Sequence, residues 1–155
     1  MQLTFYGVRG SIPTPGAEYV RYGGNTACVH IELSDGTDIS LDAGTGIRLL
    51  GDKLVKKQTP IHILLTHNHW DHIQGFPFFT PIYQPDREIF ITPGQTSLPE
   101  NDAIIKQMQG SVFPVPFSAL KSKISITPQP ENINSWKLNG ATIARLPMNP
   151  PGKGS

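Results

Sequence analysis

The sequence of 155 residues has few cysteines and no excess of charge. Its one cysteine, Cys28, excludes a disulfide within the chain and favours a reducing compartment. The sequence contains thirteen lysines and arginines and twelve aspartates and glutamates. It has no run of like charge that could bind a nucleic-acid phosphate backbone. No apolar stretch approaches the roughly 18 residues of a membrane span, and the amino terminus lacks signal-peptide features. These absences predict a cytoplasmic protein with no membrane segment and no extensive nucleic-acid surface.

The length and the turn-forming residues limit the number of domains and the type of fold. A chain of this size fits one domain and buries about two-thirds of its unfolded surface. Fifteen glycines and fifteen prolines indicate many turns between short strands. We predict a single domain over 1–155, incomplete at its carboxyl end, with a flexible tail at 147–155.

Hydrophobic patterning predicts a layered α/β (α+β) arrangement of short elements. Strands are expected at 2–7, 27–33, 37–42, 61–66, 87–92, 123–127, 135–138 and 141–146. Helices are expected at about 47–57 and 97–108, the second opened by a capping box at Ser97–Glu100. Turn residues at 34–36 and at Asn139–Gly140 predict two hairpins. The glycine- and proline-rich segment 7–26 predicts a long loop, a candidate wall of a site.

A dense cluster of histidines follows the strand expected at 61–66. Three of the five histidines, with an aspartate, lie within the six residues 67–72. In extended backbone, side chains at i and i+2 point the same way, so His67 and His69 can bind one ion. A helical turn after them would direct Asp71 and His72 to a second ion. Nitrogen and oxygen donors suit Zn²⁺, with Mn²⁺ or iron as alternatives, and up to two ions.

Other histidines and aromatic residues have a simpler interpretation. His30 and His62 each stand alone in a strand pattern, where a histidine usually packs or faces water. Trp70 and the Phe76–Phe79 segment are expected in the core more often than in a pocket wall. The four clustered donors differ, because a core would leave them unpaired unless a metal satisfied them.

The order of several motifs resembles the metallo-β-lactamase superfamily, especially its phosphodiesterase-like bacterial members. The motifs are GVRGSIP at 7–13, YGGNT at 22–26, LDAGTG at 41–46 and THNHWDHIQGFPFF at 66–79. The similarity spans nearly the whole chain. It implies the amino-terminal part of a metallo-β-lactamase-type αββα sandwich, mostly β-sheet with helices on the outer face.

The resemblance also implies roles for individual residues. His67 and His69 would bind a first metal, and Asp71 and His72 a second, with Asp71 also catalytic. Asp42 would orient a metal-binding histidine; the alternative is a turn carboxylate. Arg9 would contact a substrate phosphate if its loop folds over the site; the alternative is a solvated charge. The implied reaction is hydrolysis of a small-molecule phosphodiester or related ester by a metal-activated hydroxide, and β-lactam or thioester hydrolysis is the weaker alternative.

The chain departs from the family pattern after the motif. No histidine follows His72, and Pro150 stands where the segment Asn149–Gly152 would supply the next ligand. Proline has no donor atom for a metal. A second hypothesis is therefore a truncated or decayed non-catalytic domain with weak metal binding, acting as an assembly or regulatory piece. A half-covered sheet would expose apolar surface, which predicts a homo-oligomer.

Overall fold

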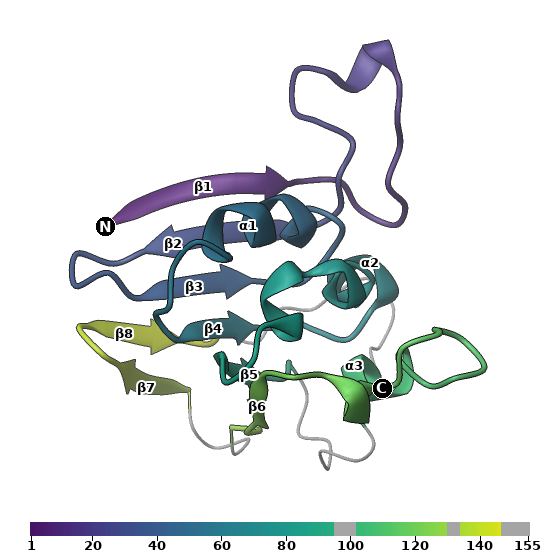
Figure 1. The fold of residues 1–155 in the computed structure, drawn as a ribbon. Coiled ribbons are helices and arrows are strands. Elements are labelled where there is room, and N and C mark those ends of the chain that lie inside the picture. Colours follow the sequence, from purple (N-terminus) through teal and green to yellow (C-terminus); the bar gives the residue numbers. More distant parts are fainter. Residues whose placement is uncertain (95–101, 130–133, 147–155) are drawn as a thin grey trace.

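The computed structural model describes residues 1–94, 102–129 and 134–146 (Figure 1). Its strands are β1 Gln2–Gly7, β2 Cys28–Glu32, β3 Asp38–Leu41, β4 Ile61–Leu64, β5 Glu88–Thr92, β6 Lys123–Ile126, β7 Ser135–Leu138 and β8 Ala141–Ala144. Its α-helices are α1 Ile47–Leu54, α2 Trp70–Ile73 and α3 Ala103–Lys106. Short 3₁₀ turns are η1 Ala17–Tyr19, η2 Phe76–Phe78, η3 Thr80–Tyr83 and η5 Phe117–Ala119.

Within the described residues, the strands form a six-stranded sheet in the order β1-β2-β3-β4-β5-β6 and a separate hairpin of β7 and β8. β1, β2 and β3 are antiparallel, and the pairs from β3 to β6 are parallel. The crossover from β3 to β4 contains α1, as expected for parallel neighbours. All eight predicted strands and both predicted hairpins are confirmed, and the fold is mixed α/β.

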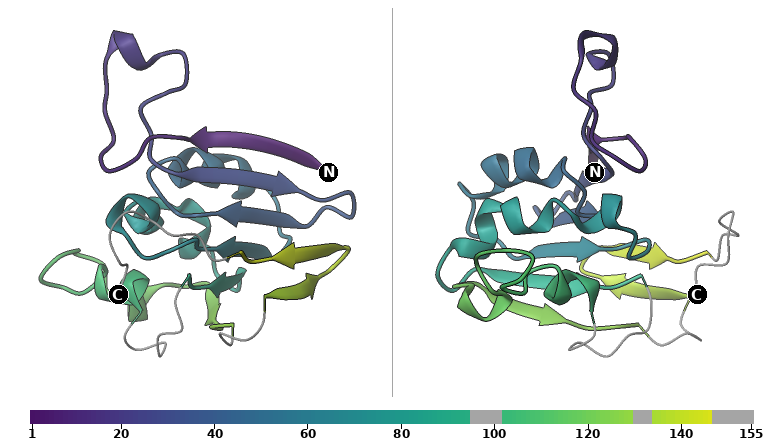
Figure 2. Two further views of the ribbon diagram at one scale, coloured as in Figure 1. Left: turned by 180° about the vertical axis from the view of Figure 1, so that it is seen from behind. Right: turned by 90° about the vertical axis from the view of Figure 1, so that its right-hand side faces the viewer.

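The two faces of the sheet carry different covers (Figure 2). The helices lie on one face, where Ile63, Ile91, Leu50 and Phe76 belong to the main core. The β7-β8 hairpin lies on the other face and packs Leu138 against the sheet. Both faces can be covered because successive side chains along each strand point to opposite faces of the sheet.

The face that carries the hairpin remains open beside it. Leu3, Phe5 and Phe90 are 47%, 64% and 38% exposed. The strand register places all three on the same face as the buried Ile39. The sequence analysis expected an exposed apolar sheet face of this kind, and the homo-oligomer that would cover it stays a prediction.

The segment between β1 and β2, called the arm below (residues 8–25), projects from the body of the protein (Figure 1). It contains η1 and is otherwise irregular, as the composition predicted. Gly24 lets the two sides of the arm approach closely, because a Cβ there would lie 1.9 Å from the Thr14 carbonyl oxygen. An isolated bridge pairs Arg9 of the arm with Thr26, just before β2.

The predicted helix ends need correction. α1 ends at Leu54 rather than near residue 57, and Arg87 donates to the carbonyl oxygens of both Leu54 and Lys57, which holds the segment after the helix. α3 begins at Ala103, where the Asp102 carboxylate accepts a hydrogen bond of 2.8 Å from the Ile104 N–H. The capping box predicted at Ser97–Glu100, the tail at 147–155 and the Asn149–Gly152 segment with Pro150 lie outside the described residues.

The predicted aromatic segment divides between core and surface. Phe76 and Phe79 are fully buried, whereas Phe78 and Trp70 are 57% and 67% exposed. The expectation of core packing is therefore confirmed for the first pair only.

Candidate metal centre

The carboxyl ends of β3, β4 and β5 meet at one edge of the sheet, because these strands are parallel neighbours. Asp42 follows β3 directly, and Thr66 and His67 come just after β4. The end of β5 packs against them: a Cβ on Gly94 would lie 2.5 Å from the Thr66 carbonyl oxygen. Strand topology thus places an acidic side chain beside the histidine motif.

The motif changes backbone conformation between its first and second halves. His69 is extended, with φ −63° and ψ 148°, and α2 begins at the next residue. An extended segment followed by a helical turn is the backbone conformation that was predicted for the motif. Asp71 and His72 consequently lie on α2, while His67 and His69 precede it.

The three imidazoles of the motif lie against one another. The ring centroid of His67 is 4.5 Å from that of His69 and 4.0 Å from that of His72. Burial, together with the neighbouring His72 and His69, lowers the pKa of His67 below 6.5. The ring of His67 is therefore neutral at pH 7, which is the form that binds a metal.

Asp42 fixes the orientation of His72. The Nδ1–H of His72 donates to Asp42 Oδ2 at 2.9 Å, because a carboxylate can only accept. The same hydrogen bond raises the pKa of His72 above 6.5. His72 therefore presents Nε2 to the site, and that nitrogen lies 3.5 Å from Asp71 Oδ2. Asp42 therefore contacts the histidine motif directly, and its role in orienting a metal-binding histidine stays a prediction.

Thr66 extends this arrangement to His67. Its hydroxyl donates to the Asp42 oxygens at 3.0 Å and lies 3.0 Å from His67 Nδ1. A hydroxyl has one hydrogen, so with that hydrogen on Asp42 it accepts from the Nδ1–H of His67. In that tautomer the Nε2 of His67 carries no hydrogen, so its lone pair is available to bind a metal. The sequence interpretation missed Thr66; a hydroxyl residue between a strand end and a histidine motif was the available signal.

The base of the arm is attached to Asp71. The Ser11 N–H donates to Asp71 Oδ2 at 2.7 Å. Ser11 and Asp42 both adopt positive φ, 67° and 62°, which is uncommon for residues with a side chain. Such strained backbone tends to gather at functional sites, and these two residues contact Asp71 and His72 of α2.

Arg9 does not lie with the motif as expected for a residue folded over it. Its guanidinium carbon is 4.6 Å from the centroid of the Tyr19 ring, within the arm. Among the residues that the structure describes, its side chain forms no hydrogen bond or ion pair, and its Nε is buried without a partner.

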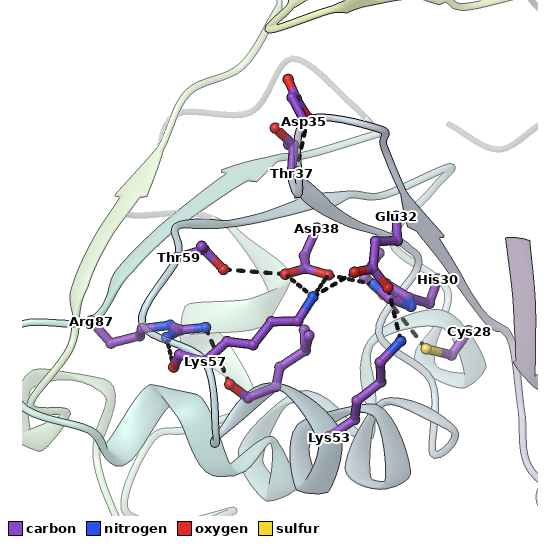
Figure 3. Close-up of polar contacts among 12 residues, drawn as sticks. Cys28, His30, Glu32, Asp35, Thr37, Asp38, Lys53, Lys57, Thr59 and Arg87 are labelled. Atoms are coloured by element: carbon purple, nitrogen blue, oxygen red, sulfur yellow. Dashed lines mark hydrogen bonds and ion pairs between the residues drawn. The ribbon is translucent and has the colours of Figure 1, made fainter. Parts of the chain in front are cut away.

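A second polar cluster lies where β2 ends and β3 begins, at the other edge of the sheet from the histidine motif (Figure 3). In the described ranges, His30, Glu32 and Asp38 are the one group of three or more potential ligands whose donor atoms all lie within 4.8 Å of one another. The motif histidines do not meet that criterion. His30 Nε2 lies 2.8 Å from Asp38 Oδ1, and both side chains are buried. The sequence interpretation gave His30 no role, and no local pattern marks this cluster.

Lysine side chains occupy the position that a metal would take in this second cluster. Lys57 Nζ donates to both Asp38 oxygens at 3.0 and 3.1 Å and to Glu32 Oε1 at 2.9 Å. Lys53 Nζ donates to Glu32 Oε2 at 3.1 Å. These two lysines lower the pKa of Glu32 to about 2. The acidic charges are already compensated, so the cluster fits a structural ion-pair network better than a metal site.

The remaining isolated histidine, His62, stacks on Phe90 with ring centroids 5.1 Å apart, consistent with the packing role expected for it. None of the helices in the described part of the chain is long and apolar enough to cross a membrane. Comparison with protein family models, curated proteins and solved structures found no match. The metallo-β-lactamase resemblance therefore rests on the sequence motifs.

Proposed function

We propose that this chain is a metal-dependent hydrolase that cleaves small-molecule phosphodiesters at His67, His69, Asp71 and His72. The ions would be Zn²⁺, with Mn²⁺ or iron as alternatives and up to two per chain. In this proposal the described fold is the amino-terminal part of an αββα sandwich.

The observation that carries the proposal is the fixed orientation of two imidazoles. Asp42 accepts from His72 Nδ1 directly and from His67 Nδ1 through Thr66. Metal-binding histidines commonly hand their second N–H to a carboxylate in this way. No lysine or arginine forms an ion pair with these side chains among the described residues, in contrast to the cluster around Asp38. The donor set therefore fits a divalent cation.

In the proposed reaction, some residues would bind the metal and others would orient these ligands. His67, His69 and His72 would supply imidazole nitrogen donors, and Asp71 would supply a carboxylate oxygen. A divalent cation, when bound, supplies Lewis acidity and activates water near neutral pH. Asp42 and Thr66 hold the rings in position, and the Ser11 N–H keeps Asp71 Oδ2 in place, at 2.7 Å.

A specific observation also favours the alternative of a non-catalytic domain with weak metal binding. In the described residues, the motif donors are not already assembled at ligand spacing. A site with few protein ligands would hold its metal weakly.

Metal content and turnover separate the two functions. The protein is dialysed after Zn²⁺ loading, its metal is measured by elemental analysis, and hydrolysis of bis(p-nitrophenyl) phosphate is followed. The proposal expects retained metal and turnover, and their loss in His69→Ala with an unchanged circular dichroism spectrum.

His62→Ala is the matched control, since His62 lies on β4 and stacks on Phe90 away from the motif. It should retain both metal and turnover. Retained metal below about half an ion per chain, together with no turnover, would support the non-catalytic domain instead.

A further inference from the structure

The arm contains a cavity that the proposed centre does not use. It measures about 360 Å³ and is lined by Arg9, Arg21, Tyr19, Tyr22 and Glu18, among others. Each arginine lies over a tyrosine: the guanidinium carbon of Arg9 is 4.6 Å from the Tyr19 ring centroid, and that of Arg21 is 5.0 Å from the Tyr22 centroid. Two cationic groups thus share one hollow.

Neither arginine has a polar partner in the described part of the chain. Arg9 and Arg21 form no ion pair or hydrogen bond through their side chains, and the buried Nε of Arg9 is unpaired. Glu18 lines the same cavity, but no ion pair joins it to either arginine. Two positive charges against one negative leave the lining with a net charge of +1. A net positive lining with two guanidinium groups that lack polar partners favours an anionic ligand.

The geometry of the arginines suits a phosphate group. A guanidinium whose face rests on an aromatic ring keeps its edge N–H groups free, and those groups match phosphate oxygens bidentately. The stacking also restricts the side chain before a ligand arrives. Tyrosine rings in the same wall offer apolar contact to an organic group attached to the phosphate.

The cavity adjoins the proposed centre through the backbone. Gly10 lines the cavity, and the N–H of the next residue, Ser11, donates to Asp71 Oδ2 at 2.7 Å. Two consecutive residues of the arm therefore link the cavity to the motif.

We propose that this cavity binds the phosphate group of a phosphorylated organic molecule, a second anchoring point besides the ester to be cleaved. That this molecule is a substrate rests on the proposed function. That the cavity binds its phosphate group does not. The test is made on the metal-free 155-residue chain, so that failure of the hydrolase proposal does not decide it.

Calorimetric titration of the EDTA-dialysed protein with phenyl phosphate and with inorganic phosphate tests the site. Phenyl phosphate should bind with one site per chain, more tightly than inorganic phosphate because of its ring. Arg21→Gln and Arg9→Gln should each weaken phenyl phosphate binding about tenfold, the scale of one charge-assisted contact. Glu18→Gln should strengthen it.

Matched controls separate this site from general charge and from the motif. Arg48→Gln removes an exposed arginine of α1, which lies 3.8 Å from Asp52, and should leave binding unchanged. His69→Ala should also leave it unchanged. Arg21 is exposed, so its variant remains informative if Arg9→Gln fails to fold.

Three results would overturn the proposal. The first is no binding of phenyl phosphate by the wild-type chain at millimolar concentration. The second is loss of binding in His69→Ala but not in Arg21→Gln, which would place the phosphate at the motif. The third is equal affinity for the two probes, which would remove the assignment to an organic phosphate.

Discussion

Asp42 and His72 are thirty residues apart in the chain, and a hydrogen bond of 2.9 Å joins His72 Nδ1 to Asp42 Oδ2. This pair links the end of β3 to α2. It also defines the imidazole nitrogen that remains available, and thereby supports the proposed metal centre.

Asp42→Ala should lower Zn²⁺ affinity about 10- to 100-fold, the usual effect of losing a carboxylate that orients a metal-binding histidine. The change would free the ring of His72 to rotate. Competition with a chromophoric chelator measures the affinity. Asp52→Ala, an exposed carboxylate on α1, is the control and should have no effect. An unchanged affinity in Asp42→Ala would remove Asp42 from the site.

Thr66→Val should change the tautomer of His67, because the valine side chain cannot accept from the Nδ1–H. Thr66→Ser keeps the hydroxyl and should restore the wild-type tautomer. Ring ¹⁵N chemical shifts of the metal-free protein report the tautomer directly. The relay through Thr66 is wrong if the valine and serine variants give the same His67 shifts.

The ion-pair network around Glu32 should make stability depend on acid pH. Hydrogen bonds from Lys57 and Lys53 lower the pKa of Glu32 from 4.5 to about 2 in the folded protein. Its contribution to the free energy of unfolding is therefore present above pH 4.5 and is lost as the pH falls toward 2. Urea unfolding across this range should show a smaller pH dependence in Glu32→Gln than in the wild type. Identical pH profiles would contradict the shift.

Gly44→Ala should destabilise the fold by about 1–3 kcal/mol, the cost of forcing extra atoms into a packed region. A Cβ at Gly44 would lie 2.4 Å from the Asp71 carbonyl oxygen and 2.5 Å from Thr26 Oγ1. Gly10→Ala is the matched control, because a Cβ there meets nothing within 4 Å. Thermal unfolding of the two variants should separate them clearly.

Cys28 should react with a thiol reagent only after unfolding. Its side chain is fully buried, and burial raises the pKa of its thiol to about 12. The thiolate is the reactive form, so the native protein should be inert to dithiobis(nitrobenzoic acid) at pH 8 and titrate one thiol in denaturant. Rapid labelling of the native protein would show that this strand opens easily.

Local patterns in the sequence determined most of the secondary structure. Alternating side chains marked the strands, and Asn139–Gly140 marked the final hairpin, because backbone periodicity and turn geometry act over only a few residues. The same local logic gave the extended and helical halves of the histidine motif. Helix ends were less predictable: α1 stops at Leu54, where Arg87, distant in sequence, donates to the carbonyl oxygens of Leu54 and of Lys57 beyond the helix.

Only the tertiary structure decided which distant side chains meet. Parallel pairing of β3 and β4 brings Asp42 to Thr66, and the fold brings the buried Asp38 carboxylate to His30, Lys57 and Thr59. It likewise put Arg9 over Tyr19 in the arm rather than beside the motif. Such pairs depend on strand register and on the cost of burying an unpaired charge, and neither leaves a local pattern in the sequence.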